Sequence, residues 1–329
     1  MSSSLKSTSS EPSFVARYTC VAILCGIFAV WGKYSFIDEA DTPAFQPIDL
    51  RTNYKYPLMM TVGYLVSLPI LHYVVSNVLN VDQKYMKALL KDSMVCYNAA
   101  QVLLNGWMVY YIVDALLNKN HPFAGDTYTT LCSYAVWIHY CDKYLEFFDT
   151  YFMVLRGRMD QVSFLHVYHH FSIAWAWWIG CALFPSGDSY FGALLNSLIH
   201  VLMYSYYCLA LLGISCPWKR YLTQAQLIQF FSVIVYTFYI QFVMKRKEGH
   251  DLEKFHYFAA AVQVFEMVSL FVLFSLFYKK TYKKKNQSEV DDACQAAVAE
   301  ITSSAQKAVK VVEGVKKYTP DATATKKAL

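Results

Sequence analysis

Long apolar runs limit how this chain can fold more than any other feature of its sequence. The chain has 329 residues, of which 56% are hydrophobic and only 16% are charged. A helix needs about 20 mostly apolar residues to cross a hydrocarbon core about 30 Å thick. Seven runs of this length predict an all-α, polytopic membrane protein, and they lie near residues 57–79, 93–116, 129–153, 163–183, 191–213, 224–244 and 256–278.

A further apolar run, from Tyr18 to Trp31, is shorter. It fits a membrane span, an interfacial helix or a segment like a signal peptide, although it has no clear small-residue cleavage site. The composition therefore predicts four regions: a disordered start, an N-terminal region with a possible membrane segment, a seven-helix membrane domain and a cytosolic tail, at 1–13, 14–55, 56–282 and 283–329.

The positions of the basic residues predict which side of the membrane each loop faces. Lys and Arg collect in cytosolic loops. Here they alternate along the chain, at 84–91, 156–158, 219–220 and 279–285, and only the group at 245–247 breaks the pattern. This alternation predicts a cytosolic C-terminus. The final Lys326-Lys327-Ala328-Leu329 resembles a dilysine signal for return to the endoplasmic reticulum, so we expect a multi-pass protein of that membrane.

Four groups of polar residues lie inside or beside the apolar runs, where ionisable side chains are costly and indicate function. Each group shares one helix face by its spacing. The groups are Lys143, Glu146 and Asp149 or Thr150; His166, His169 and His170; Asn196, His200, Met203 or Tyr204, and Tyr207; and Thr223, Gln226 and Gln229. The predicted topology brings all four to the cytosolic half of one bundle. The alternative for any one group is a set of hydrogen bonds between helices.

Three closely spaced imidazoles could bind a metal. Membrane desaturases and hydroxylases also contain an HxxHH motif, but they use several histidine boxes to hold two irons. This chain has one box, and only His200 looks like a further partner. The nine cysteines are scattered without a CxxC pair, which favours simple packing. We therefore expect no metal and no other cofactor. A di-iron lipid enzyme and a seven-span receptor or transporter remain as alternatives.

Four stretches carry a family resemblance, in the order KYLEFFDT, QVSFLHVYHH, NSLIHVLMYSYY and TQAQLIQ. Together they resemble the signature motifs of the ELO family of very-long-chain fatty acid elongases, over residues from about 56 to 282. The resemblance implies a seven-helix fold around an acyl tunnel. It also implies the condensation of acyl-CoA with malonyl-CoA to 3-ketoacyl-CoA, carbon dioxide and CoA. Gln161 and the sequence Leu-His-Val-Tyr-His-His look most like the branch that uses polyunsaturated substrates.

The resemblance also implies roles for individual residues. His169 would take the acyl group, with His200 facing it, while His166 and His170 orient groups or transfer protons. Glu146 and Asp149 would either orient these histidines or pair with Lys143. Further expected contacts to substrate or to the catalytic residues are Lys143, Gln161, Asn196, Tyr204, Gln226 and Gln229. The cations at the predicted cytosolic mouth could hold CoA phosphates or could serve only as positive-inside anchors, and they are Lys143, Arg156, Arg158, Lys219 and Arg220.

The expected partners follow from this chemistry. They are acyl-CoA, malonyl-CoA, membrane lipid and the ketoacyl-CoA reductase, dehydratase and enoyl reductase that complete an elongation cycle, whereas nucleic acid is not expected. The sequence leaves the acyl chain length, the double-bond preference and the oligomeric state open.

Overall fold

The structure, a computed structural model, describes residues 11–38, 54–119, 121–124, 130–183, 188–244, 257–280 and the single position 303. The chain divides into two compact units, Met1–Phe274 and Ser275–Leu329, and the architecture below is that of the first. The predicted disordered start is described only from residue 11. The tail, with its dilysine pair, lies outside the described residues apart from position 303.

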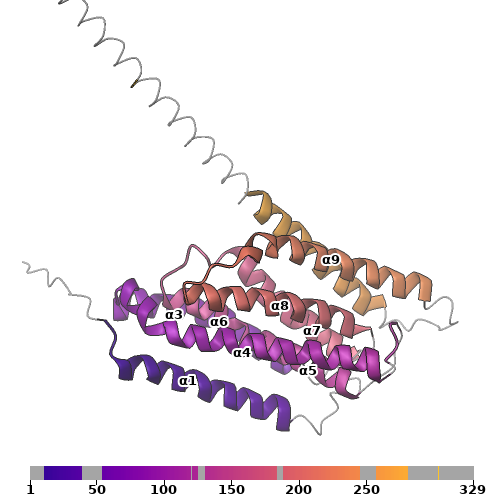
Figure 1. Cartoon of the computed structure of the whole chain (residues 1–329), viewed down its shortest axis with the longest axis horizontal. Helices are drawn as coiled ribbons and strands as arrows, with labels where there is room; N and C mark the ends of the chain where they lie inside the picture. The colour runs from indigo at the N-terminus through magenta and orange to yellow at the C-terminus, as the bar shows by residue number, and fades with distance from the viewer. Residues whose placement is uncertain are drawn as a thin grey trace, which may run out of the picture. The chain divides into compact units, whose positions relative to one another are not determined.

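All regular structure in the described segments is helical, as the apolar runs predict (Figure 1). The elements are α1 (Phe14–Gly32), η1 (Lys33–Asp38), α3 (Lys55–Tyr73), η2 (Val74–Leu79), α4 (Gln83–Asn118), α5 (Thr130–Leu145), α6 (Phe147–Leu155), α7 (Phe164–Leu183), α8 (Ser189–Leu211), η3 (Pro217–Tyr221), α9 (Leu222–Phe238) and η4 (Tyr239–Met244). A last helix occupies Tyr257–Lys280.

Six of the described helices are long and apolar enough to cross a membrane. Five of them correspond to predicted spans, and the sixth is Phe14–Phe36, which includes the apolar run whose role the sequence left open. The predicted spans 129–153 and 163–183 are helical but do not reach the same apolarity over that length. The first is divided into α5 and α6 and contains several charged residues, and the second is α7, which carries the histidine box.

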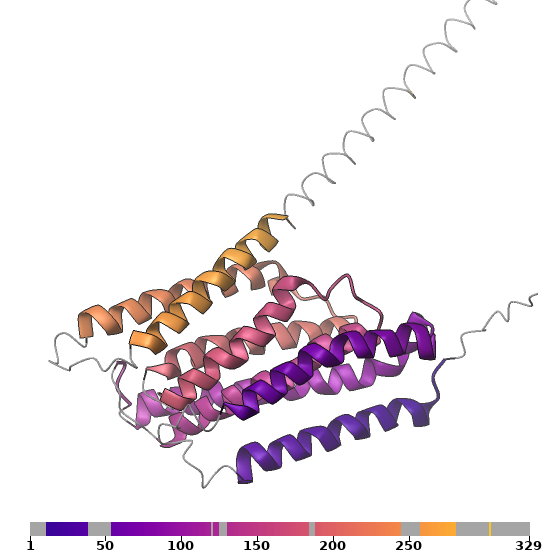
Figure 2. The same cartoon turned by 180° about the vertical axis from the view of Figure 1, so that it is seen from behind.

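Helix α1 lies beside α4 in both views of the fold (Figures 1 and 2). Arg17 forms an ion pair with Asp92 of α4, 2.6 Å between Nη2 and Oδ2. At the other end of α1, the Trp31 indole donates to the backbone carbonyl of Cys141 in α5, at 3.1 Å. The N-terminal helix is therefore packed against α4 and bonded to α5, the helix that carries Lys143.

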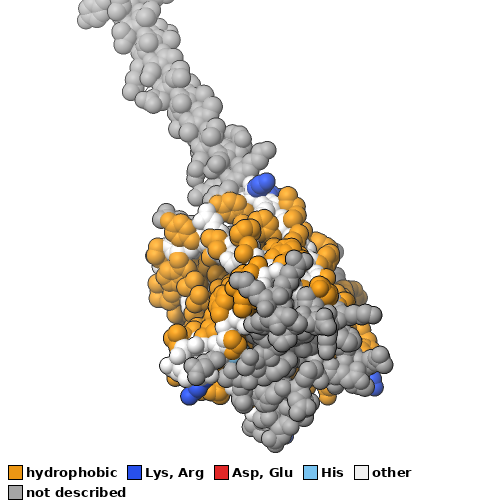
Figure 3. All heavy atoms as spheres, turned by 90° about the vertical axis from the view of Figure 1, so that its right-hand side faces the viewer, with side chains coloured by type: hydrophobic (Ala, Val, Ile, Leu, Met, Phe, Trp, Pro, Cys, Tyr) orange, Lys and Arg blue, Asp and Glu red, His pale blue; other side chains and the backbone are white. Residues whose placement is uncertain are grey.

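The central helix of the unit is α4, which packs against α8, α5 and α1. Helix α5 contacts both α7 and α8, while α3 contacts α6 and α7. Many large apolar side chains remain on the outside, and the described surface is mostly hydrophobic on the face in Figure 3. An apolar exterior around a core that contains charged residues is the arrangement expected in a lipid bilayer.

Local sequence signals fix the helix ends near the polar groups. Gly157 ends α6 with a positive φ of 68°, and its N–H and that of Arg158 donate to the carbonyls of Val154 and Met153. This is a Schellman-type ending, which favours glycine. Ser163 caps α7, because its hydroxyl accepts the N–H of His166 at 3.2 Å. The histidine box therefore begins in the first turn of its helix.

Candidate active site

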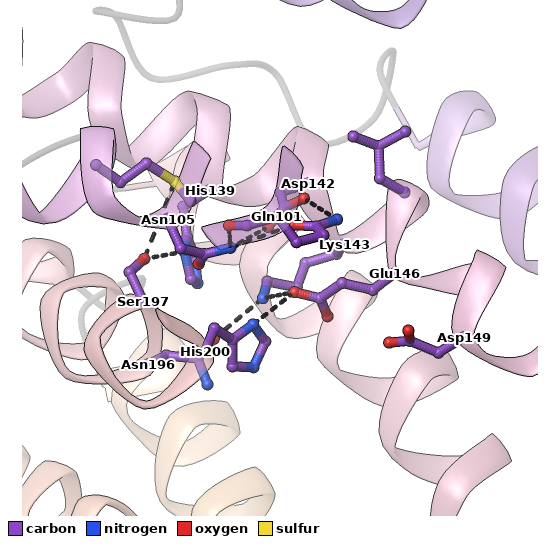
Figure 4. Close-up of polar contacts among 12 residues, drawn as sticks. Gln101, Asn105, His139, Asp142, Lys143, Glu146, Asp149, Asn196, Ser197 and His200 are labelled. Atoms are coloured by element: carbon purple, nitrogen blue, oxygen red, sulfur yellow. Dashed lines mark hydrogen bonds and ion pairs between the residues drawn. The ribbon is translucent and has the colours of Figure 1, made fainter. Parts of the chain in front are cut away.

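The polar cluster begins with a buried ion pair at the junction of α5 and α6. Lys143 donates from Nζ to Oε1 of Glu146, and both side chains are only 1% exposed. The same ammonium donates to Oδ1 of Asn196 in α8, at 3.0 Å. Nδ1 of His200, one turn further along α8, lies 3.0 Å from Oε1 of Glu146 (Figure 4). Two of the predicted polar groups therefore meet directly.

Glu146 lies at a one-residue interruption between two helices. Helix α5 ends at Leu145 and α6 begins at Phe147, so the predicted continuous helix through this motif is wrong at this point. The N–H of Asp149 donates to the carbonyl of Glu146, a tighter i+3 bond, and the hydroxyl of Tyr97 in α4 donates to the carbonyl of Leu145 at 3.3 Å. Glu146 itself keeps helical backbone angles, φ −61° and ψ −16°, and its side chain faces His200 of α8.

Asp149 also faces α8. The hydroxyl of Tyr204 donates to its Oδ2 at 2.8 Å. Tyr204 is fully buried, as the predicted stripe along α8 requires, but Tyr207 at the end of that stripe is 40% exposed. Asn196, His200 and Tyr204 therefore lie on a buried part of α8, whereas Tyr207 does not.

The histidine box contacts the opposite side of α6. Nε2 of His166 lies 2.9 Å from Oγ1 of Thr150, which in turn lies 2.8 Å from the hydroxyl of Tyr64 in α3. The ring of His170 packs edge-to-face on His166, with centroids 4.6 Å apart, and also contacts Tyr64 and Phe147. Thr150, the alternative to Asp149 at the sequence level, is thus the α6 residue that holds this part of the box.

His169 lies on a different part of α7 from His166. Its ring contacts His170 and, at 6.2 Å between centroids, Phe274 of the last helix. Nδ1 of His169 and Nδ1 of His170 are both buried, and neither has a hydrogen-bond partner within the described part of the chain. Buried polar atoms are normally paired, so unpaired imidazole nitrogens point to a functional role.

The remaining predicted residues lie farther from the charged cluster. Gln161 is exposed in the loop before α7, so its side chain is not part of the cluster. Gln226 is partly buried, with Nε2 4.0 Å from the sulfur of Met203, and Gln229 is buried. Through Gln226, the TQAQLIQ stretch thus adjoins α8.

Of the cations expected at the cytosolic mouth near CoA phosphates, Lys143 was placed wrongly. Lys143 is buried in its ion pair and is not at a mouth of the bundle. Arg158 is exposed, and its hydrogen bonds lower the pKa of Asp160 below its ordinary value. Lys219 is exposed and lies over the Tyr206 ring. The Arg220 side chain lies outside the described atoms.

Several buried polar residues were missed at the sequence level. Asp142 is fully buried, and so are Gln101 and Asn105 of α4, which donate to its carboxylate. Glu266 of the last helix accepts from the Ser172 hydroxyl of α7 at 2.6 Å. An ionisable residue within an apolar run was the available signal for both acids.

The possible metal ligands in the described structure do not match a di-iron centre, whose two irons would be held mainly by histidines. Among the described residues, one group of three His, Cys, Asp or Glu side chains brings its terminal atoms within 4.8 Å of one another, and it consists of Asp142, Glu146 and His200. It contains a single imidazole, none of the box histidines, and the Lys143 ammonium already bonds Glu146. A cation on the carboxylate opposes a metal at that point.

The fold and the cluster define a polytopic helical membrane protein with buried imidazoles beside a buried ion pair. The chain belongs to the ELO family, described as GNS1/SUR4, whose model matches residues 49–290. It is 35% identical over 256 residues to very long chain fatty acid elongase 5 of Tachysurus fulvidraco, covering 74% of this chain and 81% of that protein. It is 38% identical over 228 residues to elongase 5 of Xenopus laevis, covering 65% and 74%.

A further relative is very long chain fatty acid elongase 2 of Mus musculus, 36% identical over 250 residues, which cover 72% of this chain and 79% of that protein. With the family match, these relatives make the chain a fatty acid elongase, a condensing enzyme of fatty acid elongation. The alternatives of a receptor, a transporter or a di-iron enzyme are therefore set aside.

The buried ion pair generates a stability prediction. The variant Lys143→Met leaves the carboxylate of Glu146 buried without its ammonium, which should cost about 3–5 kcal/mol of unfolding free energy. The double variant Lys143→Met/Glu146→Leu replaces the pair by apolar groups of similar size and should recover part of that loss. Denaturant unfolding of the purified proteins in detergent measures both. A single variant as stable as the parent protein would contradict the account.

Proposed function

We propose that this elongase condenses polyunsaturated acyl-CoA with malonyl-CoA through an acyl-imidazole at His169. The observation that best supports the proposal is the unpaired, buried Nδ1 of His169, next to a second unpaired imidazole at His170. A neutral imidazole is a good nucleophile toward a thioester, and burial favours the neutral form. The proposed reaction needs no cofactor beyond its two CoA substrates.

The reaction takes two steps. In the first, a nitrogen of His169 bonds to the thioester carbonyl carbon, the carbon–sulfur bond breaks, and CoA leaves with the imidazole proton as a thiol. In the second, malonyl-CoA loses carbon dioxide, and the resulting enolate carbon attacks the acyl carbon and breaks its bond to His169. The departing imidazole takes up one proton from solvent, passed through a neighbouring histidine, and is again neutral. The product is a 3-ketoacyl-CoA, which the ketoacyl-CoA reductase, dehydratase and enoyl reductase of the cycle would then process.

The other polar residues have separate tasks in this proposal. His200, held against Glu146, supplies a hydrogen bond or a proton to the oxygen that gains charge. His166, bonded to Thr150, and His170 orient the box and move protons. Lys143, Asn196, Asp149 and Tyr204 hold these groups, because each bonds within the same buried cluster. The bilayer keeps water from the acyl intermediate.

A substrate panel tests the function. Purified protein with malonyl-CoA and matched pairs of acyl-CoAs, equal in length but saturated or polyunsaturated, should give 3-ketoacyl-CoA detected by mass spectrometry. We expect faster turnover with the polyunsaturated member of each pair. Equal or faster turnover with the saturated member would reject the polyunsaturated preference, and no ketoacyl product with any member would reject the condensation itself.

The covalent step has its own prediction. With acyl-CoA alone, the parent protein should release one equivalent of CoA in a burst and add the acyl mass to a peptide spanning 161–170. The variant His169→Ala should lose both signals, while Cys141→Ser, a control at a buried cysteine of α5, should keep them. A preparation that condenses but shows neither burst nor adduct would instead favour direct attack within a ternary complex.

The membrane setting is the last part of the proposal: the endoplasmic reticulum, with the C-terminal segment in the cytosol. Support comes from two groups of basic residues, one in the first turns of α4 at 84–91 and one after α6 at 156–158. A Cβ added to Gly157 would lie 2.7 Å from Nε2 of Gln83, so the two groups lie at the same end of the bundle. A tag inserted after Tyr282 should be digested by protease added to sealed microsomes. Protection of the tag would reverse this orientation.

A further inference from the structure

Asp142 is held by two amide side chains from the neighbouring helix. Nε2 of Gln101 donates to its Oδ1 at 2.9 Å, and Nδ2 of Asn105 donates to its Oδ2 at 3.3 Å (Figure 4). All three side chains are fully buried. Nδ2 of Asn105 also faces the carbonyl and Oε1 of Gln101, at 3.0 and 3.2 Å, and these acceptors fix the orientation of its amide.

The two amide donors determine the charge of Asp142. A protonated carboxyl has one oxygen that must donate, whereas an ionised carboxylate accepts at both. Because each oxygen of Asp142 receives an N–H, these contacts favour the ionised form of its carboxyl group. The amides are neutral, so they stabilise the negative charge without cancelling it.

With Asp142 ionised, the buried cluster around it has a net negative charge. Asp142, Glu146 and His200 bring their polar atoms within 4.8 Å of one another, and Lys143 supplies the ammonium. Two ionised carboxylates and one ammonium leave a net charge of −1 in a buried site, which is costly. Among the described residues, none of the other titratable groups that interact with this cluster is a lysine or an arginine, so a further positive charge has to come from a histidine. These groups are Tyr97, His139, Asp149, His169, His170 and Tyr204. An ionised Asp149 would increase the need for that positive charge.

One further proton balances the site, and the geometry indicates where it lies. Nδ1 of His200 lies 3.0 Å from Oε1 of Glu146, the separation of an ion pair, but the described atoms give that nitrogen no aligned hydrogen bond. Two lone pairs at this distance repel each other, so a proton on Nδ1 is favoured, and the neutral tautomer already supplies it. The charge balance then calls for a second proton, on Nε2. A proton on each nitrogen of His200 makes the group neutral and gives the imidazole a second donor, Nε2–H, that Glu146 does not use.

We infer that Asp142 is a positioning residue that keeps His200 as an imidazolium, so that His200 is the acidic partner of a neutral His169. The inference rests on the condensation proposed above. Asp142 touches no reacting atom; it acts through its charge on the Glu146–His200 pair. His200 can then donate a hydrogen bond to the thioester or enolate oxygen while His169 acts as the nucleophile.

Substituting the carboxylate by its neutral isostere tests this role. In the full-length enzyme, Asp142→Asn should lower kcat by roughly 10- to 100-fold with KM for both CoA substrates unchanged. Removing the negative charge weakens the hold of the site on its proton, so the alkaline limb of the kcat profile should move to lower pH. A loss of kcat with an unmoved pH profile would show a purely structural role and overturn the inference.

A charge exchange within the same hydrogen bond provides the matched control. The double variant Asp142→Asn/Gln101→Glu keeps an amide facing a carboxylate and returns the charge to the site, about 3 Å from its original place. It should restore the alkaline limb toward its original pH and recover part of kcat. A double variant no better than Asp142→Asn would count against the charge as the cause.

A spectroscopic measurement keeps the inference independent of the proposed reaction. Nitrogen-15 NMR of histidine-labelled protein, with His200 assigned by the variant His200→Gln, reports its protonation directly even if the protein makes no ketoacyl-CoA. We expect an imidazolium signal at neutral pH in the parent protein and a neutral imidazole in Asp142→Asn. A neutral His200 in the parent protein would overturn the inference whether or not condensation is observed.

Discussion

The burial of charge in an apolar bundle is the constraint on which the site depends. A lone ammonium or carboxylate at that depth would cost far more than a folded domain can spare. Lys143 and Glu146 are tolerated because they meet each other, Asn196 and His200 within one contact network. These residues lie on α5, at its junction with α6 and on α8, so the charges also fix how α5 and α8 approach each other. The same bonds that offset desolvation place His200.

The short helix α6 distributes these contacts between two sides of the bundle. Asp149 reaches Tyr204 on α8, while Thr150 reaches His166 on α7 and Tyr64 on α3. Adjacent residues of a helix point about 100° apart, which lets one short segment serve both sides. The interruption at Glu146 separates α6 from α5, and the ion pair beside it contacts Asn196 and His200 of α8. One motif therefore links the histidine box to the charged cluster without direct bonds between them.

The sequence predicted the helical class and the main polar groups, because apolar length and residue spacing are local properties. It could not predict the interruption at Glu146, which depends on Tyr97 bonding to the carbonyl of Leu145. It also placed Lys143 near CoA phosphates, because the sequence alone does not show whether a lysine near basic loops is buried in an ion pair or open to a ligand. The two hydrogen bonds to the Asp142 carboxylate were missed because their donors, Gln101 and Asn105, lie some 40 residues earlier, and only the packing of the helices brings them together.

The central claim is that the imidazoles of α7 and the charged cluster around His200 act on one acyl group. The most direct test is an experimental structure of the protein after incubation with acyl-CoA alone. The account predicts density continuous from a nitrogen of His169 into the acyl chain, with the acyl oxygen within hydrogen-bond distance of Nε2 of His200. An intact thioester, or an acyl chain bound away from either histidine, would contradict it.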